Sequence, residues 1–321
     1  MRNSITEILK IKYPIIQGGM GNISDPLLAA AISNAGGLGT IGTGNLPISE
    51  ISNKIKVMIS NTTKPCCVNI PISVHPYPKL VAEEVIAHRV PVVSLSAGNP
   101  SDLIGMFHEH NIKVICVTST VRQAKKAEIL GADLIVCEGY EAAGINSPNE
   151  STTMTLIPQV AKEVSIPIVA AGGIADGKGF AAAIALGASG VQLGTRFVAT
   201  KEANFHPNYK KSILKANDES TVIVGRSFKQ VRRILKNHYA ESLLNLENKR
   251  GSIEEYKEKT SEERHYIGTV EGNDREGFMT GGQIAGLIED LPTVAEVMEN
   301  MINEAKDILN PNYFNLSLKL I

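Results

Sequence analysis

The sequence lacks several features that would assign it to a specialised class of protein. None of the apolar runs in its 321 residues approaches the roughly 20 residues that span a bilayer. Its first residues lack the apolar stretch and cleavage site of a signal peptide. Its 32 basic and 33 acidic residues give a formal net charge of -1, which favours neither nucleic acid nor an anionic membrane as a partner. We therefore expect a cytoplasmic protein without such partners.

Motifs for metals, nucleotides and disulfides are also scarce. The four cysteines, Cys66, Cys67, Cys116 and Cys137, lie in apolar runs and lack metal-ligand spacing. We predict buried, unpaired thiols in a reducing compartment and no metal site. No P-loop or zincin motif occurs. A G-x-G-x-x-G match at 37–42 falls within a predicted strand after a helix, so it is not a Rossmann fingerprint.

Short apolar runs do recur along the first two thirds of the chain. Several are apolar throughout, which is typical of parallel strands buried on both faces. The eight runs span 14–19, 38–42, 66–72, 90–96, 113–119, 134–139, 167–173 and 190–196. Helical patterns separate most of them, for example one that opens at Asp25-Pro26 and one that ends at Gly131. Eight such units over about 200 residues predict a (β/α)₈ TIM barrel.

The pattern changes after Arg196, where a charged stretch replaces the alternating runs. We predict three parts: a ligand-binding barrel over 1–200, a small excursion or lid domain over 201–275, and a glycine loop and helix over 276–321 that return to the barrel. A basic stretch, Lys229, Arg232, Arg233 and Lys236, is interpreted as an exposed helix face rather than as a docking site for an acidic carrier protein.

The predicted strand ends are rich in glycine and small polar residues. Active sites of such barrels lie at the carboxyl ends of the strands, and the loops after the last two strands often bind a phosphate. Here those two loops contain AAGGIADGKG and LGTRF. Glycine lets a flat ligand approach the backbone and its N–H groups. We therefore expect a phosphate-bearing ligand at this end of the barrel, with tight turns as the alternative role of these glycines.

A series of motifs resembles one family in order along the chain. They are PIIQGGMG, AISNAGGLGTIG, VNI, SAGNP, CEGYEAAG, TTMTLIPQV, AAGGIADG, LGTRF, HPNYK and GGQIAG, spanning about residues 5 to 310. As a set they resemble the FMN-dependent nitronate monooxygenase (2-nitropropane dioxygenase-like) family, which includes the flavin-type enoyl-acyl-carrier-protein reductase II.

The resemblance implies non-covalent FMN in the barrel and assigns roles to matching residues. Gly18, Gly19 and Met20 would line the isoalloxazine, with Asn69 near its polar edge. Glu138 would hold a ribityl hydroxyl or order its loop. The remaining implied residues bind the phosphate (Gly172, Gly173, Gly194 and Thr195) or close over the flavin (Gly281, Gly282 and Gln283).

One residue departs from the family pattern. Family members place a catalytic histidine where this chain has Ile145, in a loop about two residues longer than usual. An apolar side chain cannot accept a proton. Glu141, Asn146 and His206 are the candidates to replace it. We interpret Glu141 as a solvated loop carboxylate, Asn146 as a hydrogen-bonding group that is no base, and His206 as structural, so the catalytic residue remains unknown.

Three functions are compatible with these observations. The favoured one is NAD(P)H-dependent, FMN-dependent reduction of an activated acceptor, such as a small-molecule or carrier-bound enoyl thioester or a quinone. The second is oxidation of an alkyl nitronate with O₂, because a preformed nitronate anion does not require a base. The third is a flavin-binding regulator whose catalysis has decayed, which only Ile145 supports. The sequence leaves a homodimer open.

Overall fold

Parallel strands alternate with helices over the first two thirds of the chain. The computed structural model describes residues 4–310. The barrel strands are β1 (Ile15–Gln17), β2 (Gly39–Gly42), β3 (Cys66–Pro71), β4 (Val92–Ser96), β5 (Lys113–Thr118), β6 (Leu134–Glu138), β8 (Ile168–Ala171) and β9 (Gly190–Leu193). The helices on their outer side are α2 (Pro26–Asn34), α3 (Ile48–Ser60), α4 (Pro78–Ala87), α5 (Ser101–His108), α6 (Val121–Ile129), α7 (Thr153–Glu163) and α8 (Gly177–Ala185). The short helix α9 (Thr195–Val198), which follows β9, is buried.

These strands form a TIM barrel, as the sequence predicts. They pair in parallel in the order β1-β9-β8-β6-β5-β4-β3-β2, and a bridge between Ile16 and Leu38 brings β1 beside β2. Each of the eight predicted apolar runs overlaps one barrel strand. The G-x-G-x-x-G match ends in β2, where a Cβ on Gly39 would lie 1.8 Å from the carbonyl oxygen of Ala29 in α2. This glycine therefore allows close packing of α2 on the sheet.

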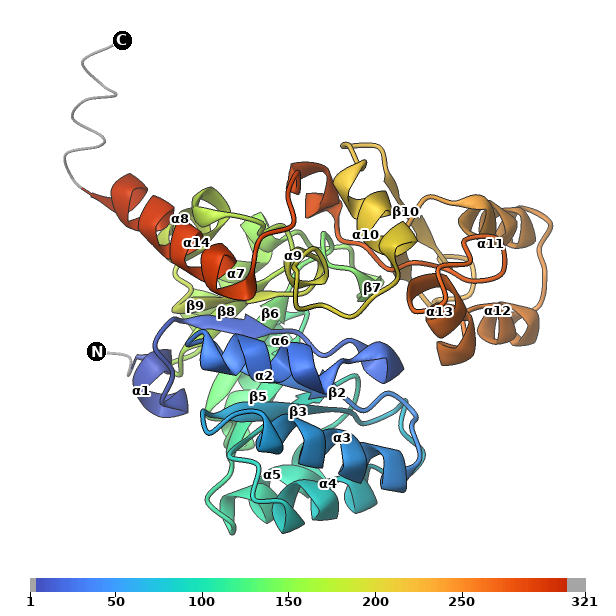
Figure 1. Ribbon diagram of the computed structural model, residues 1–321. Coiled ribbons are helices and arrows are strands. Elements are labelled where there is room, and N and C mark those ends of the chain that lie inside the picture. Colours follow the sequence, from blue (N-terminus) through green and yellow to red (C-terminus); the bar gives the residue numbers. More distant parts are fainter. Residues whose placement is uncertain (1–3, 311–321) are drawn as a thin grey trace, which may run out of the picture.

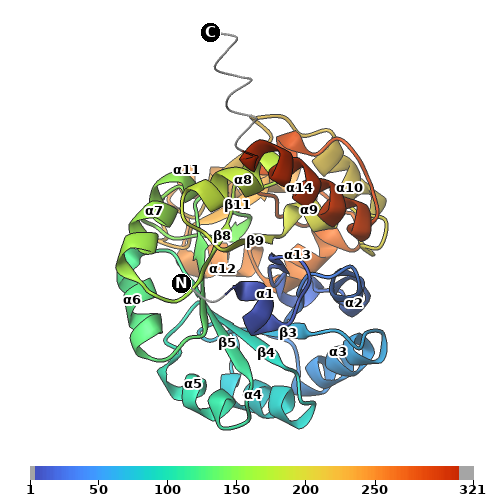
Figure 2. The same cartoon turned by 90° about the vertical axis from the view of Figure 1, so that its left-hand side faces the viewer.

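The strand residues divide between two hydrophobic clusters. Ile16, Cys67, Ile115 and Val169 belong to the inner cluster, whereas their sequence neighbours pack against the helices. Helix α1 (Ile5–Leu9) closes the amino-terminal end of the barrel, because Ile5 and Leu9 join the inner cluster. Figure 2 shows α1 in the middle of the ring of helices. The four cysteines are all buried and unpaired, as predicted.

A smaller lobe follows the barrel and has its own core. It contains α10 (Pro207–Leu214), β10 (Thr221–Val224), β11 (Arg232–Leu235), α11 (His238–Asn248), α12 (Ile253–Lys259) and α13 (Glu262–Thr269). Its hydrophobic cluster includes Ile234, Leu243, Tyr256 and Phe278. Strand β11 pairs with β10 on one side and with β7 (Gly144–Ile145) on the other. The lobe, at the right in Figure 1, is thereby joined to the loop after β6.

The chain then returns to the barrel. A 3₁₀ helix, η2 (Gln283–Leu287), leads to α14 (Val294–Leu309), which packs against α8. Thr293 and Glu296 form a capping box at the start of α14. Glu304 accepts a hydrogen bond of 2.8 Å from the Gly177 N–H at the start of α8. Residues 311–321, the end of the predicted third part of the chain, lie outside the described residues.

The interpretation of the basic stretch as an exposed helix face is wrong. Residues 232–235 form strand β11, and Arg233 is buried with 4% of its surface exposed. Its Nε donates to the Tyr140 carbonyl at 3.0 Å, and its guanidinium lies 5.0 Å from the Tyr140 ring centroid. The guanidinium can be buried here because the Tyr140 carbonyl accepts its hydrogen bond and the Tyr140 ring provides a cation–π contact.

Candidate active site

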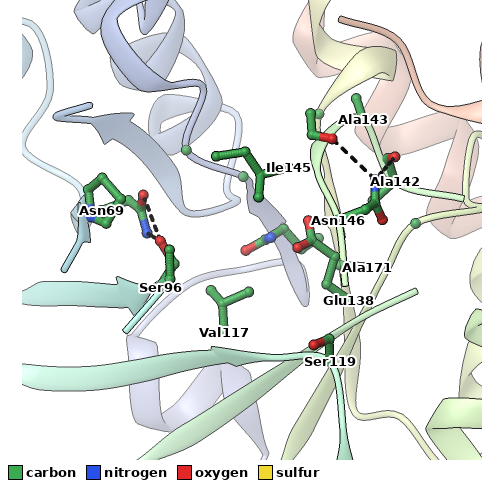
Figure 3. A pocket seen from close by; sticks show the side chains of 18 of the residues that line it. Asn69, Ser96, Val117, Ser119, Glu138, Ala142, Ala143, Ile145, Asn146 and Ala171 are labelled. Carbon is green, nitrogen blue, oxygen red and sulfur yellow. Dashed lines mark hydrogen bonds between the residues drawn. The ribbon is translucent and has the colours of Figure 1, made fainter. Parts of the chain in front are cut away.

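A cavity of about 930 Å³ opens at the carboxyl ends of the barrel strands. The loops after β1, β4, β6, β8 and β9 form its floor and walls, and residues of the smaller lobe and the segment before η2 form the rest. Its volume lies at the upper end of the range for small-molecule and cofactor sites. Figure 3 shows the side chains of Asn69, Glu138 and Ile145 within it.

Most residues implied to bind a flavin line this cavity. They are Gly18, Gly19, Met20, Asn69, Glu138, Gly172, Gly173, Gly194, Thr195 and Gly282. Gly281 and Gln283 do not line it. A Cβ on Gly281 would lie 2.5 Å from the Leu235 side chain, and the Gln283 N–H donates to the Glu141 carbonyl at 2.9 Å. Both residues therefore join the final segment to the lobe and to the loop after β6.

The loops after β8 and β9 expose the backbone of glycine residues, which have no side chains, to the cavity. Gly172 and Gly173 have φ angles of +90° and +75°, a conformation that favours glycine. A Cβ on Gly194 would meet no protein atom within 4 Å, so this backbone faces open space. The Thr195 hydroxyl accepts a hydrogen bond of 3.0 Å from the Gly282 N–H, which brings the final segment over the same loop. This arrangement fits a phosphate or another oxyanion.

A polar cluster lies on the neighbouring strands β3 and β4. The Asn69 amide donates to the Ser94 carbonyl, the Ser94 hydroxyl and the Ser96 hydroxyl, each at 3.2 Å. A Cβ on Gly19 would lie 2.7 Å from the Asn69 Cβ, so the loop after β1 runs directly over this cluster. The cluster fixes the orientation of the Asn69 amide beside the cavity and so places a polar group at one edge of a ligand there.

Glu138 provides a carboxyl group at the end of β6. Burial raises its pKa from 4.5 to about 7, because the charged form loses hydration. A carboxyl with this pKa is partly protonated near neutral pH and can both donate and accept hydrogen bonds. It therefore suits a ligand hydroxyl better than a cation.

Two of the three candidates for the missing base lie in the loop after β6. Both Glu141 carboxylate oxygens accept from the Thr153 N–H, at 3.0 and 2.9 Å, and one accepts from the Thr153 hydroxyl. Glu141 is therefore a cap for α7 and not the solvated carboxylate that the sequence suggested. Asn146 is buried and donates to the Ala142 and Gly144 carbonyls, so it holds the loop in shape.

The third candidate lies outside the cavity. His206 precedes α10, and its Nδ1 accepts a hydrogen bond of 3.1 Å from the Asn208 N–H. A Cβ on Gly272 would lie 1.9 Å from the same nitrogen, so the ring packs against the lobe backbone. The structural interpretation of His206 fits this placement.

Comparisons with known proteins identify the family. A family model described as nitronate monooxygenase matches residues 2–77 and 73–304. The chain belongs to the nitronate monooxygenase family. It is 37% identical to FabK from Thermotoga maritima, whose solved structure superposes with a TM-score of 0.92 and covers 98% of this chain and 100% of that one.

Two curated relatives bear different names. A probable nitronate monooxygenase from Staphylococcus aureus (strain JH9) is 31% identical over 96% of this chain and 98% of its own length. A (3aS,4S,5R,7aS)-5-hydroxy-7a-methyl-1-oxo-octahydro-1H-indene-4-carboxyl-CoA dehydrogenase from Rhodococcus jostii (strain RHA1) is 30% identical over 95% of this chain and 96% of its own. Membership of the nitronate monooxygenase family makes the chain a flavin-type oxidoreductase, which favours an enzyme over a decayed regulator.

The family resemblance implies a histidine at position 145, where this chain has isoleucine. Ile145 lies in β7, lines the cavity and has 51% of its surface exposed. Its backbone pairs with Arg232 of β11. An exposed isoleucine at this point gives the cavity an apolar surface where the family resemblance implies a proton acceptor.

Sequence reasoning missed the part of the cavity that the smaller lobe supplies. Tyr209, Arg232, Glu262, His265 and Thr280 all line it, although they come from α10, β11, α13 and the segment before η2. Tyr209 lies in the HPNYK motif. No motif marks the other four, because their proximity depends on how the lobe folds over the barrel. The one available signal was the spacing of Glu262 and His265, which places both on one face of a helix.

The described residues supply no metal site and no membrane helix. Among residues 4–310 no group of three or more His, Cys, Asp or Glu side chains is placed to hold a metal ion. Within the same range no helix has the length and apolar composition that a membrane crossing requires.

Proposed function

We propose that this chain is an FMN-dependent, NAD(P)H-dependent reductase of α,β-unsaturated thioesters. The observation that carries the proposal is the combination of glycine loops and polar side chains that suit FMN with an apolar residue, Ile145, in the cavity wall. Bound FMN would accept a hydride from the nicotinamide and pass it to an electron-poor acceptor. A reductase of this kind needs a shaped apolar surface and a proton donor, but no base at position 145.

The residues of the cavity fit FMN. The open backbone at Gly194 and the turn at Gly172 and Gly173 suit its phosphate. The Glu138 carboxyl, whose pKa burial raises to about 7, suits a ribityl hydroxyl. Asn69, held by Ser94 and Ser96, would orient the polar edge of the ring. Together these groups bind the two polar ends and leave the flat middle to the loop after β1.

The relatives support a thioester as the acceptor. The Rhodococcus jostii relative is named as a dehydrogenase of a carboxyl-CoA, which contains a thioester. The exposed Ile145 would contact the acyl part of such a substrate, because an apolar side chain in a cavity wall gains free energy when an acyl chain covers it. A coenzyme A or carrier-protein handle would then extend out of the cavity.

Anaerobic mixing of the FMN-loaded protein tests the proposal. We expect NADH or NADPH to bleach the flavin absorbance, and crotonyl-CoA to restore it faster than a quinone or an alkyl nitronate does. A protein that binds no FMN, or that neither nicotinamide reduces, would contradict the proposal. Faster reoxidation by the quinone would contradict a thioester as the acceptor but would still support a flavin-dependent reductase.

Nitronate oxidation is the second candidate. Arg232 brings a cation to a cavity wall, which would attract a nitronate anion, and the Staphylococcus aureus relative is named as a probable nitronate monooxygenase. Oxygen consumption with propionate-3-nitronate in the absence of any nicotinamide would favour this function. No oxygen consumption above that of free FMN would remove it.

A further inference from the structure

A chain of three polar side chains, Glu262, His265 and Thr280, connects the smaller lobe to the cavity. His265 of α13 has 5% of its surface exposed, and its Nε2 lies 3.1 Å from the Thr280 hydroxyl. Its Nδ1 lies 3.8 Å from a Glu262 carboxylate oxygen. All three residues line the cavity. A carboxylate, an imidazole and a hydroxyl in this order form an arrangement that moves protons in other enzymes.

The surroundings hold the chain in one geometry. The His265 ring stacks on Phe278 at 4.9 Å between centroids with an interplanar angle of 3°. The Glu262 carboxylate accepts the Asn22 N–H at 3.1 Å, and a Cβ on Gly21 would lie 2.8 Å from it. The carboxylate is therefore fixed against the loop that follows Met20.

Hydrogen bonds and charges surround the Glu262 carboxylate. Burial alone would raise the pKa of Glu262, but hydrogen bonding and charge from His265, the Asn22 N–H and the Arg232 charge together lower it. Glu262 is therefore a carboxylate at neutral pH and stabilises an imidazolium beside it. The Arg232 guanidinium also lies 5.1 Å from the Phe278 ring centroid.

Tyr209 of α10 is a further titratable group beside this chain. Its hydroxyl donates to the Thr280 carbonyl at 2.7 Å and lies 3.3 Å from the Thr280 hydroxyl. Burial raises the Tyr209 pKa to about 12, although its hydrogen bond to Thr280 acts in the opposite direction. Tyr209 therefore stays protonated at working pH and positions Thr280 without exchanging a proton.

We infer that Glu262, His265 and Thr280 form the proton relay of this enzyme and take the role of the histidine absent at position 145. Thr280 is the group that touches the substrate, whereas His265 and Glu262 act through it. The inference rests on the proposed reduction of an unsaturated thioester. It assigns the proton-handling role to residues that none of the sequence motifs contains.

The proposed step is balanced. Reduction adds a hydride, which originates on the nicotinamide, to one carbon of the double bond and a proton to its neighbour. The Thr280 O–H bond breaks as the new C–H bond forms, and the Thr280 oxygen takes the proton from Nε2 of His265. The imidazolium becomes a neutral imidazole beside the Glu262 carboxylate, and solvent returns the proton after product leaves. The nicotinamide is oxidised and the thioester is reduced by the same two electrons.

The closing experiment separates the two half-reactions in His265→Asn. We expect flavin reduction by the nicotinamide to keep its wild-type rate constant, while reoxidation by crotonyl-CoA slows by about 10²-fold or more, the range of general acid catalysis. His110→Asn is the matched control, because His110 is exposed after α5, does not line the cavity and has its side chain bonded to the Met106 carbonyl. His110→Asn should reoxidise at the wild-type rate.

Two variants of Thr280 test the relay even if His265→Asn does not fold. Thr280→Val removes the hydroxyl and should slow reoxidation by about 10²-fold, whereas Thr280→Ser retains it and should stay within about threefold of wild type. The solvent deuterium isotope effect on reoxidation should be present in wild type and Thr280→Ser. Glu262→Gln should also slow reoxidation and leave flavin reduction unchanged, because His265 loses its carboxylate partner.

The outcomes distinguish the two proposals. Equal reoxidation by wild type and His265→Asn, or by Thr280→Val and Thr280→Ser, would overturn the relay and leave the reductase intact. A wild-type protein that no nicotinamide reduces would overturn the proposed function, and the relay would fall with it. Ile145→His placed in the His265→Asn background should recover part of the lost rate, since it restores a proton donor to the same cavity.

Discussion

At the scale of the residue, Glu138 couples the site to pH. The pKa of the Glu138 carboxyl is about 7 in the folded protein, whereas its ordinary value is 4.5. Between pH 4.5 and pH 7 the carboxyl is therefore protonated in the folded state and ionised in the unfolded state. The free energy of unfolding of the flavin-free protein should therefore fall as pH rises from about 4.5 to about 7. A full shift of this size corresponds to about 3 kcal/mol, and opening to the cavity reduces it to about 1–3 kcal/mol.

Glu138→Gln tests this dependence. The variant has no carboxyl to ionise, so its unfolding free energy should not decline over this pH range, and at pH 7.5 it should exceed that of wild type. Urea unfolding at pH 5 and pH 7.5 measures both. An identical decline in wild type and Glu138→Gln would show that other groups cause it.

Ile145 is the second residue with a specific consequence. Ile145→His puts a titratable group on an exposed cavity position, and we expect it to raise the rate of neutral nitroalkane oxidation by about 10²-fold, the size of general base catalysis. Oxygen uptake with nitroethane measures this rate. Ile145→Asn is the control because it is polar but cannot accept a proton at neutral pH. Equal rates in the two variants would mean that position 145 does not face the reacting carbon.

At the scale of the element, the loop after β6 is held from three sides. Glu141 caps α7, β7 pairs with β11, and the Tyr140 ring lies between the guanidiniums of Arg226 and Arg233 at 5.9 and 5.0 Å from its centroid. Arg226 also pairs with Glu150 at 2.6 Å. These contacts fix the wall that carries Ile145, so the apolar surface of the cavity is a rigid feature.

Glu141→Ala tests the role of Glu141 as a cap. Losing the acceptor at the first turn of α7 should lower the unfolding free energy by about 1 kcal/mol, the usual effect of removing a helix cap. Glu163→Ala is the control at the other end of α7, where an exposed ion pair with Lys125 should contribute little to stability. Chemical unfolding compares the two. Glu141→Ala with unchanged stability and abolished turnover would instead support a catalytic Glu141.

The elements that the sequence predicted are those with a local signature. Barrel strands are buried on both faces and so consist of apolar runs, such as LIVCE at Leu134–Glu138. The glycines after β8 mark a turn that needs positive φ, which is again a local property. Strand β11 had no such signature, because RRIL contains two arginines whose burial depends on Tyr140 and Phe278, far away in sequence.

The same distinction applies to the site. Gly281 belongs to a motif, and a Cβ there would meet the Leu235 side chain. His206 and Glu141 are polar residues near the site whose hydrogen bonds are with backbone N–H groups of helices. His265 and Thr280 reach the cavity only because the lobe folds over the barrel, which no pattern within either segment reveals.

At the scale of the whole molecule, the lobe has a hydrophobic cluster of its own, although its Tyr209, Ile213 and Leu235 belong to the main cluster of the barrel. The lobe cluster around Leu243, Tyr256 and Phe278 is distinct from the two clusters of the barrel. Yet the lobe contributes one wall of the cavity, including His265. The glycine loops and polar side chains that suit FMN therefore belong to the barrel, whereas the proposed proton relay belongs to the lobe.

Leu243→Ala tests this division and the predicted boundaries near residues 201 and 275. Leu243 is fully buried, so the cavity left by its truncation should destabilise the lobe by about 2–5 kcal/mol. Amide hydrogen exchange should accelerate within α11, α12 and β10, while the barrel strands keep their protection, because local opening need not involve the larger core. Flavin affinity should stay near the wild-type value while reoxidation by the thioester slows. Ile129→Ala, which truncates a side chain with 82% of its surface exposed, is the control and should change neither. Equal loss of protection in barrel and lobe would show that the two cores unfold as one unit.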